Sequence, residues 1–365
     1  MEPVRRQHPD GLPDPDHVST DTETNTSTDT QTAGAGASAA PAVGRSAPAD
    51  AFLDHRPLLH AIAYRMLGSV HDAEDAVQDA YLRWTAQDPE TVANPAAFLT
   101  TVTTRLCLDR LRSAAVRREL YVGPWLPEPL QTGAGGGANT GVGVGVGVGL
   151  GTTAGTAAGF CSDPAATVAL RESASIGMLL LLDRLSPAER AVFVLREAFE
   201  VPYAQIAQII ERTPESCRQL HHRARRRVAE TPQRRRPTHH RTPDPARDQR
   251  IVEGFLAAAR GGDLERLTAL LREDVIVYND GGGKVSAALR PIHGSAKVAR
   301  LYTHIIPKRL TEGTVITFHR FNHTPGMLVR RPRTTFVYMF DLDEDDRIAH
   351  IYMIANPDKL THLSA

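Results

Sequence analysis

The stretch that decides how the middle of the chain folds is VPYAQIAQIIERTPESCRQLHHRARRRV, residues 201–228. Its apolar residues recur at the three- and four-residue spacing of a buried helix stripe. They form two sets, Ile206, Ala207, Ile209 and Ile210, and then Cys217, Leu220, Ala224 and Val228. Between the sets, Thr213 and Pro214 have the character of an N-cap and a first helical residue. The pattern therefore predicts two short helices joined by a tight turn.

The second of these helices is strongly basic on the side away from its apolar stripe. That side carries Arg218, Gln219, His222, Arg223, Arg225 and Arg226. Two short helices, of which the second is apolar behind and basic in front, are typical of a helix-turn-helix. In such a motif, residues near the start of the second helix contact base edges, and arginines further along contact phosphates. A solvated basic face would not require the matched preceding helix, so the stretch predicts DNA binding.

The positive charge is local, because 42 Lys and Arg are balanced by 42 Asp and Glu over the 365 residues. This length allows two or three domains, each with its own core. The longest apolar run, 178–182, is too short to span a bilayer, and the N-terminus lacks the apolar segment of a secretory signal. Cys107, Cys161 and Cys217 are an odd and sparse set, typical of a reducing compartment. We therefore predict a cytoplasmic protein that does not interact with a membrane.

Three segments of biased composition divide the chain. Residues 1–49 are rich in small and polar residues, and we predict that they are disordered. Residues 131–162 contain a Gly-Val alternation, which favours a flexible linker because glycine weakens a strand. Residues 231–248 hold four prolines, which exclude one continuous helix. The ordered blocks that remain are 50–130, 163–230 and 249–365.

The first ordered block predicts helices with charged faces. In HDAEDAVQDAYLRW, residues 71–84, one side is apolar and the other is acidic. The acidic face consists of Asp72, Asp75, Gln78 and Asp79. Asn94 and Pro95 then open a helix that carries Arg105, Arg110 and Arg112. From composition alone, such faces are most often solvated surface.

The third ordered block predicts an α+β fold. Two helices interrupted at residues 261–262 precede a series of strand patterns, from DVIVYN to RIAHIYMIA, with one helix between the first two strands. Helices followed by a mostly antiparallel curved sheet form a cone that encloses a pocket. Polar residues that could line it are Tyr278, Asp280, Lys284, His293 and His319. Asp280 could serve as a general base there, but DGGG favours a turn whose glycines let another segment approach.

The order of these motifs resembles the extracytoplasmic-function (ECF) sigma factors. Residues 64–84 and 94–113 are similar to region two of that family, and residues 182–228 are similar to region four. The segment YVGPWLPEPL (121–130), with DGGGK (280–284) and NPDKL (356–360), resembles the SigJ-type subgroup, which adds a SnoaL-like domain. The resemblance implies a multidomain protein with two all-α sigma domains, the second a helix-turn-helix, followed by a C-terminal α+β SnoaL-like cone.

The resemblance also implies partners and site residues. The acidic face would dock on the β′ clamp helices of the RNA polymerase core, whose β flap is a further contact. The promoter −10 element, with a base flipped out, would be held in the loop 87–94 and by cations nearby. The residues concerned are Gln87, Asn94, Arg105, Arg110 and Arg112. The −35 element would contact Ser216, Arg218, Gln219, His222, Arg223 and Arg226. Regulatory roles fall on Trp125, Leu126, Pro127, Asp280, Gly281, Gly282, Gly283, Lys284, Asn356, Pro357, Asp358, Lys359 and Leu360.

We therefore predict a sigma factor that directs RNA polymerase to promoters and is regulated in cis by its SnoaL-like domain. We predict no enzymatic activity, no catalytic residue, no metal site and no cofactor, and leave a small ligand in the C-terminal pocket open. One alternative is a helix-turn-helix repressor or activator with a ligand-binding domain, although such a protein needs neither the acidic helix nor the loop that melts DNA. The other alternative is a SnoaL-like isomerase or cyclase.

Overall fold

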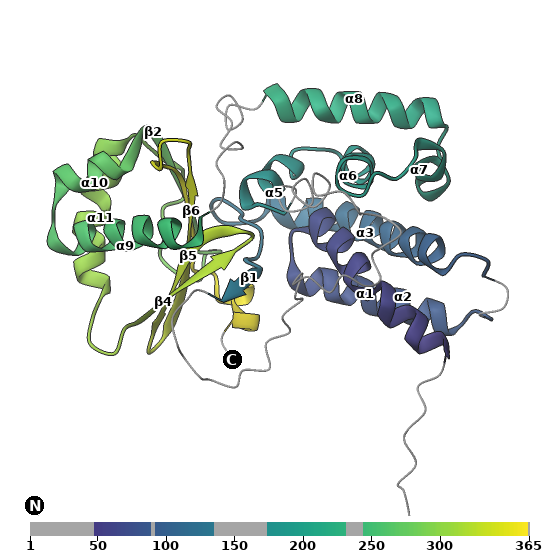
Figure 1. Cartoon of the computed structure of the whole chain (residues 1–365), viewed down its shortest axis with the longest axis horizontal. Helices are drawn as coiled ribbons and strands as arrows, with labels where there is room; N and C mark the ends of the chain where they lie inside the picture. Colours follow the sequence, from purple (N-terminus) through teal and green to yellow (C-terminus); the bar gives the residue numbers. More distant parts are fainter. Residues whose placement is uncertain (1–46, 89–91, 135–173, 231–243, 364–365) are drawn as a thin grey trace, which may run out of the picture. The chain divides into compact units, whose positions relative to one another are not determined.

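The computed structural model describes residues 47–88, 92–134, 174–230 and 244–363, which are drawn in colour in Figure 1. Nearly all of the predicted N-terminal tail and the Gly-Val alternation lie outside these residues. Within them, no helix is long and apolar enough to cross a membrane.

The first helical part consists of α1 (Ala47–Leu67), α2 (Val70–Thr85) and α3 (Pro95–Glu119). Helix α2 begins where the Ser69 hydroxyl accepts a hydrogen bond from the Asp72 amide. Helix α3 begins where the Asn94 side chain accepts one from the Ala97 amide at 3.0 Å, as the N-cap pattern predicts. The predicted apolar stripe of α2 is buried, with Trp84 among the most buried large side chains.

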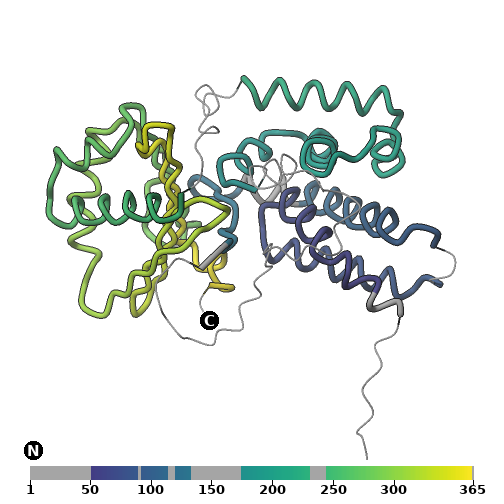
Figure 2. Tube along the Cα trace, in the orientation of Figure 1, coloured from purple at the N-terminus to yellow at the C-terminus, as the bar shows by residue number. Residues whose placement is uncertain are grey.

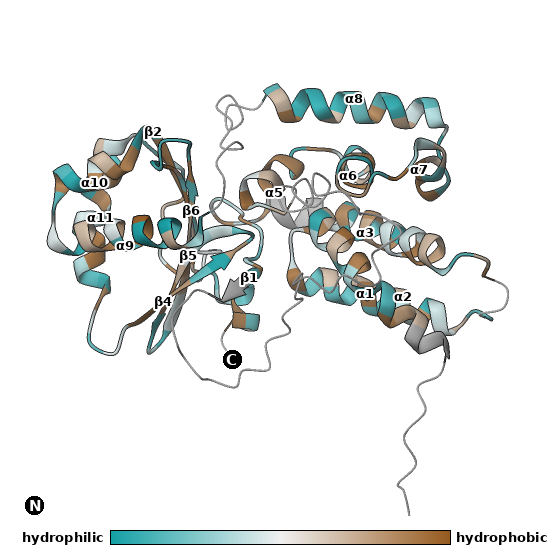
Figure 3. Cartoon of the chain, in the orientation of Figure 1, coloured by the Kyte–Doolittle hydropathy of each residue, from teal (hydrophilic) through white to brown (hydrophobic). Residues whose placement is uncertain are grey.

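The second helical part consists of α5 (Ile176–Leu182), α6 (Pro187–Phe193), the π-helical turn η2 (Val194–Ala198), α7 (Tyr203–Ile210) and α8 (Pro214–Glu230). Ser186 and Glu189 form the capping box that starts α6. Glu211 adopts a left-handed conformation (φ 56°) and ends α7. The predicted pair of helices joined by a tight turn is confirmed, and Figure 3 shows α8 as mostly hydrophilic with short apolar bands.

The two helical parts share one hydrophobic core. Arg190 of α6 is buried in it and donates hydrogen bonds to the carbonyl oxygens of Leu182 and Met66, each at 2.8 Å. Burial lowers the pKa of Arg190 to about 10. Because a buried guanidinium must satisfy its donors, these bonds fix α6 against the end of α1.

The C-terminal part is an α+β cone built from helices and one mixed sheet. Its helices are α9 (Pro245–Gly261), α10 (Leu264–Leu270) and α11 (Ser295–Arg309). Its strands are β2 (Leu271–Asp280), β3 (Ile292–His293), β4 (Val315–Phe321), β5 (Thr324–Arg331), β6 (Thr334–Leu342) and β7 (Ile348–Ile354). The 3-10 turns η4 (Pro357–Lys359) and η5 (Thr361–Leu363) follow β7.

The sheet has the strand order β1-β4-β5-β6-β7-β2-β3, and only the β2–β7 pair is parallel among the pairs in the described residues. Alternate residues of β6 belong to different cores, because successive side chains of a strand point to opposite faces. Phe336, Tyr338 and Phe340 pack with the helices of the cone. Val337 and Met339 pack on the other face, with Leu126 and Ile176 from the preceding parts of the chain. Figure 2 traces the chain through these elements.

Three predicted boundaries are wrong by a few residues. Strand β1 (Gln131–Ala134) lies in the predicted linker but pairs antiparallel with β4, whose free edge offers hydrogen bonds that composition does not reveal. Helix α9 begins at Pro245 inside the proline-rich segment, because the Asp244 side chain caps its first turn. Helix α1 begins at Ala47, inside the predicted tail.

Candidate functional site

A buried ion pair lies where β2 ends and the C-terminal tail begins. The Asp280 carboxylate at the end of β2 is 0% exposed, and its Oδ2 lies 2.7 Å from Nζ of Lys359 in η4. The Lys359 side chain is 8% exposed. Two charges removed from water are stable together only when further hydrogen bonds satisfy their remaining donors and acceptors.

Those hydrogen bonds come from residues 121–130, which we call the connecting segment. The Leu126 amide donates to Oδ2 of Asp280 at 2.8 Å, and Lys359 donates to the Leu126 carbonyl oxygen at 2.5 Å. The Tyr121 hydroxyl donates to Oδ1 of Asp280, and burial raises the pKa of Tyr121, which keeps this donor protonated. The Lys359 ammonium also lies 4.3 Å from the centre of the Trp125 ring. The connecting segment therefore completes the ion pair.

The glycines after Asp280 allow this approach, as the sequence predicts. Gly282 has φ 58°, and a Cβ there would lie 2.3 Å from Nδ2 of Asn356. That amide donates to the Tyr121 hydroxyl at 2.8 Å. Lys284 pairs with Asp358 at 2.6 Å on the surface. The structure thus brings the motifs DGGGK, WLPEP and NPDKL together, and we call this arrangement the Asp280–Lys359 junction.

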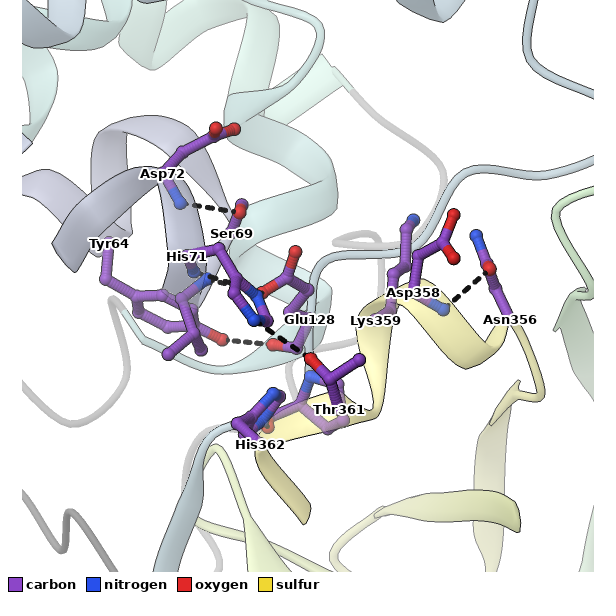
Figure 4. A network of polar contacts seen from close by, with 12 residues as sticks. Tyr64, Ser69, His71, Asp72, Glu128, Asn356, Asp358, Lys359, Thr361 and His362 are labelled. Atoms are coloured by element: carbon purple, nitrogen blue, oxygen red, sulfur yellow. Dashed lines mark hydrogen bonds and ion pairs between the residues drawn. The ribbon is translucent and has the colours of Figure 1, made fainter. Parts of the chain in front are cut away.

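A second set of buried hydrogen bonds ties the connecting segment to α1 and to the sheet. The Tyr64 hydroxyl donates to the Glu128 carbonyl oxygen at 2.6 Å and accepts from Asn322 at 2.6 Å. The Glu128 carboxylate accepts from the Val70 amide at 2.7 Å, at the start of α2 (Figure 4). None of Tyr64, Glu128 and Asn322 belongs to a predicted site. The only signal in the sequence is that Glu128 lies inside WLPEP.

The acidic face of α2 is partly occupied by a partner from α3. Asp75 and Gln78 are exposed, and Asp72 is half-buried. Asp79 pairs with Arg110 at 2.7 Å, so residues assigned to polymerase docking and to the −10 element contact each other. No local sequence pattern predicts this pair.

The other predicted −10 residues are not gathered into one site. Gln87 and Asn94 are exposed at the two ends of their loop, whose residues 89–91 lie outside the described part. Arg112 pairs with Asp109 on the surface. Arg105 instead donates to the carbonyl oxygens of Ile209 and Gln208, at 2.9 and 3.1 Å, and pairs with Glu211 at 3.0 Å. Arg105 is therefore bound to the C-terminal end of α7 and to Glu211, the residue that follows it.

The predicted −35 residues lie on the outer side of α8, as the apolar stripe predicts. Arg218, Gln219, His222, Arg223 and Arg226 are exposed, and Ser216 is half-buried. The residue before His222, His221, belongs to no predicted site. It is buried and contacts Tyr203 Oη and Glu197 Oε1, each at 2.7 Å. The two adjacent histidines thus differ in exposure, because His221 faces the core side of the helix and His222 faces solvent.

The polar residues proposed to line one pocket of the cone do not lie together. Lys284 and His293 are exposed, and Asp280 is enclosed in its ion pair. His319 lines a separate cavity of about 290 Å³ beside α9, with Asp248 and Arg320. Burial lowers the pKa of His319, and Arg320 pairs with Asp248 at 2.7 Å. The prediction that these residues line one pocket is wrong, because the turn after β2 leaves Lys284 exposed to solvent.

Comparison with known proteins agrees with this arrangement of parts. Residues 51–117 match sigma-70 region 2, and residues 177–228 match sigma-70 region 4. The chain belongs to the ECF RNA polymerase sigma factors, which direct RNA polymerase to promoters. It is 35% identical to ECF RNA polymerase sigma factor SigJ of Mycobacterium tuberculosis over 318 residues. The aligned residues cover 84% of this chain and 91% of that protein.

Two further similarities point the same way. The probable ECF RNA polymerase sigma factor SigI of M. tuberculosis is 34% identical over 60% of this chain and 66% of its own length. The crystal structure of M. tuberculosis SigJ superposes with a TM-score of 0.61 and 32% identity, over 86% of this chain and 97% of that chain. The comparisons give no support to the repressor or to the isomerase alternative.

The Asp280–Lys359 junction predicts a large cost for breaking its ion pair. Replacing Asp280 with Asn leaves the Lys359 ammonium buried without its carboxylate, which should lower the free energy of unfolding by about 3–5 kcal/mol. The control, Asp358→Asn, breaks an exposed pair and should cost less than about 1 kcal/mol. Urea unfolding followed by circular dichroism measures both. Equal losses for the two variants would contradict the central place of the buried pair.

Proposed function

We propose that the C-terminal cone regulates the sigma parts of this protein in cis, through the Asp280–Lys359 junction. The observation that supports this most strongly is that the junction closes on the connecting segment and not on the cone alone. The connecting segment follows region two and leads toward region four. Whatever holds it influences how the two promoter-binding parts can be arranged.

The contact of Arg105 gives a physical reason for regulation. Its guanidinium is bound by the C-terminal end of α7, so it must leave Ile209 and Gln208 before it can hold DNA at the −10 element. A conformation that satisfies Arg105 internally therefore competes with promoter binding. A tethered cone acts at a high effective concentration, about millimolar for short flexible linkers, so even weak contacts can bias this competition.

We further propose the individual roles of the exposed faces. The acidic face of α2 docks on the β′ clamp helices, region four contacts the β flap, and the outer side of α8 reads the −35 element. The protein works in the cytoplasm, where RNA polymerase and the chromosome are found. We propose no enzymatic activity for the cone, because Asp280, its candidate base, already accepts from Lys359, Leu126 and Tyr121.

Regulation in cis predicts that two truncations change transcription differently. A chain ending before Asp244 lacks the whole cone, whereas a chain ending before Asn356 keeps the sheet and loses Lys359. With purified core polymerase and promoter DNA, both should bind polymerase, and their transcript yields should differ from each other by at least about fivefold, as expected for a coupling of 1–3 kcal/mol. Asp280→Asn in the full chain should also change the yield. Full-length yields from both truncations would exclude regulation by the cone.

Docking through α2 predicts that a charge reversal weakens binding of core polymerase when it lies on α2 but not when it lies elsewhere. Asp75→Lys should weaken binding of core polymerase at least about tenfold, because it places a like charge in the proposed interface. Asp75 is chosen since Asp79 also holds Arg110. The matched control is Glu253→Lys on α9, which changes the net charge by the same amount at an exposed position. The docking assignment is wrong if pull-down assays show equal polymerase binding by both variants.

The outer side of α8 predicts two distinguishable effects on promoter binding by the holoenzyme. Arg218→Ala should relax the preference at particular −35 positions by about 1–3 kcal/mol. Arg226→Ala lies two turns further along, so it should weaken all promoters alike and reduce the salt slope by about one. Binding titrations on a set of single-base promoter variants at several salt concentrations measure both. The same uniform loss for both variants would refute the assignment.

A further inference from the structure

We propose that His71, Glu128 and His362 form a binding site for a divalent transition-metal ion of the zinc class. Their donor atoms lie within 4.8 Å of one another. Figure 4 shows the three side chains meeting from the start of α2, the connecting segment and η5 near the C-terminus. The sequence predicts no metal site, because the three residues are far apart and belong to no ligand motif.

The hydrogen bonds of His362 leave one ring nitrogen suited to bind a metal. Its Nε2 lies 2.8 Å from the Pro129 carbonyl oxygen, which can only accept, so Nε2 carries the hydrogen. In the neutral ring, Nδ1 then holds a lone pair. This Nδ1 is buried and has no hydrogen-bond partner among the described residues. An unpaired buried acceptor destabilises the fold, and a bound cation would satisfy it.

His71 can offer the cluster a second lone pair. Its Nε2 lies 2.9 Å from the Thr361 hydroxyl oxygen, and its Nδ1 lies 3.1 Å from Oε2 of Glu128. When Nε2 donates to the hydroxyl, Nδ1 and the carboxylate are two acceptors that face each other. A cation between them resolves that conflict. In metal sites, histidine ligands commonly donate their other ring N–H to an oxygen acceptor, and both histidines here have such a partner.

The donor set selects the class of ion. Two imidazole nitrogens and one carboxylate oxygen suit Zn²⁺ better than Mg²⁺ or Ca²⁺, which prefer oxygen ligands. Zinc bonds of about 2.0–2.1 Å in a tetrahedron place ligand atoms about 3.3 Å apart, so the donors must close by up to about 1.5 Å. The His71 side chain, 48% exposed, has room to move. Glu128 is held in place by the Val70 amide.

The site would connect segments that the Asp280–Lys359 junction also connects. A bound ion would join the last residues of the chain to the start of α2, the helix whose acidic face we assign to polymerase docking. Metal binding would then favour the arrangement in which the Asp280–Lys359 junction is formed. This consequence rests on the proposed regulation in cis, but metal binding itself does not.

The test measures metal binding by the full-length, metal-free protein, without transcription as a readout. Zn²⁺ is titrated in competition with a chromogenic chelator, and Co²⁺ is titrated separately and followed by its visible absorption. His71→Gln and His362→Gln should each weaken the site at least tenfold and remove one equivalent of tight Zn²⁺, together with the tetrahedral Co²⁺ bands. The control His304→Gln changes an exposed histidine on α11 and should bind as the wild type does.

The proposal is overturned if His71→Gln retains the affinity, stoichiometry and Co²⁺ spectrum of the wild type. Substitution of the exposed His71 should leave the core intact, and matching circular dichroism of the metal-free proteins checks this. An equal loss in the His304→Gln control would also overturn it, since the ion would then be bound through scattered surface histidines. A titration that shows no metal binding would leave the two truncation experiments on regulation unaffected.

Discussion

A carboxylate and an ammonium that are both removed from water must satisfy each other and all their remaining hydrogen bonds, and Asp280 and Lys359 do so only with the help of the connecting segment. Leu126 contributes both its amide and its carbonyl group to the pair. The main chain of a segment that follows region two is thus an integral part of a charged site in the C-terminal cone. Neither charge can leave without exposing the other to an apolar surrounding.

The apolar packing agrees with this dependence. The face of the sheet turned away from the helices of the cone buries Leu126 from the connecting segment and Ile176 from α5, together with Leu360 and Leu363 of the tail. Separation of the cone from the sigma parts would expose that surface to water, which is unfavourable. Core polymerase would therefore have to compensate for the lost contacts if the holoenzyme uses an opened form. Such a balance suits the proposed regulation in cis, in which the contribution of the cone changes between the free and the polymerase-bound protein.

Local sequence patterns predicted most of the elements. The predicted apolar stripes of α2, α7 and α8 are mostly buried, and the cap at Asn94 starts α3 as expected. These features depend on periodicity and on neighbours a few residues away. The sequence also indicated that DGGG forms a turn that another segment approaches.

The contacts between distant parts could not be predicted in the same way. Arg105 looks like other exposed arginines, and only the folded chain places the carbonyl oxygens of Ile209 and Gln208 beside it. His221 and His222 are adjacent and chemically identical, yet the phase of α8 buries one and exposes the other. The hydrogen bond between Tyr64 and Asn322 joins residues 258 positions apart and carries no local signal.

Amide hydrogen exchange at Leu126 tests the central claim most directly, because its N–H donates to the buried Asp280 carboxylate. The account predicts slow exchange of this amide in the full-length protein. Lys359→Met should accelerate that exchange at least about tenfold, while amides at the centre of the β5–β6 pair keep their protection. Rapid exchange at Leu126 in the wild type, or unchanged protection in Lys359→Met, would contradict the claim that this ion pair holds the connecting segment.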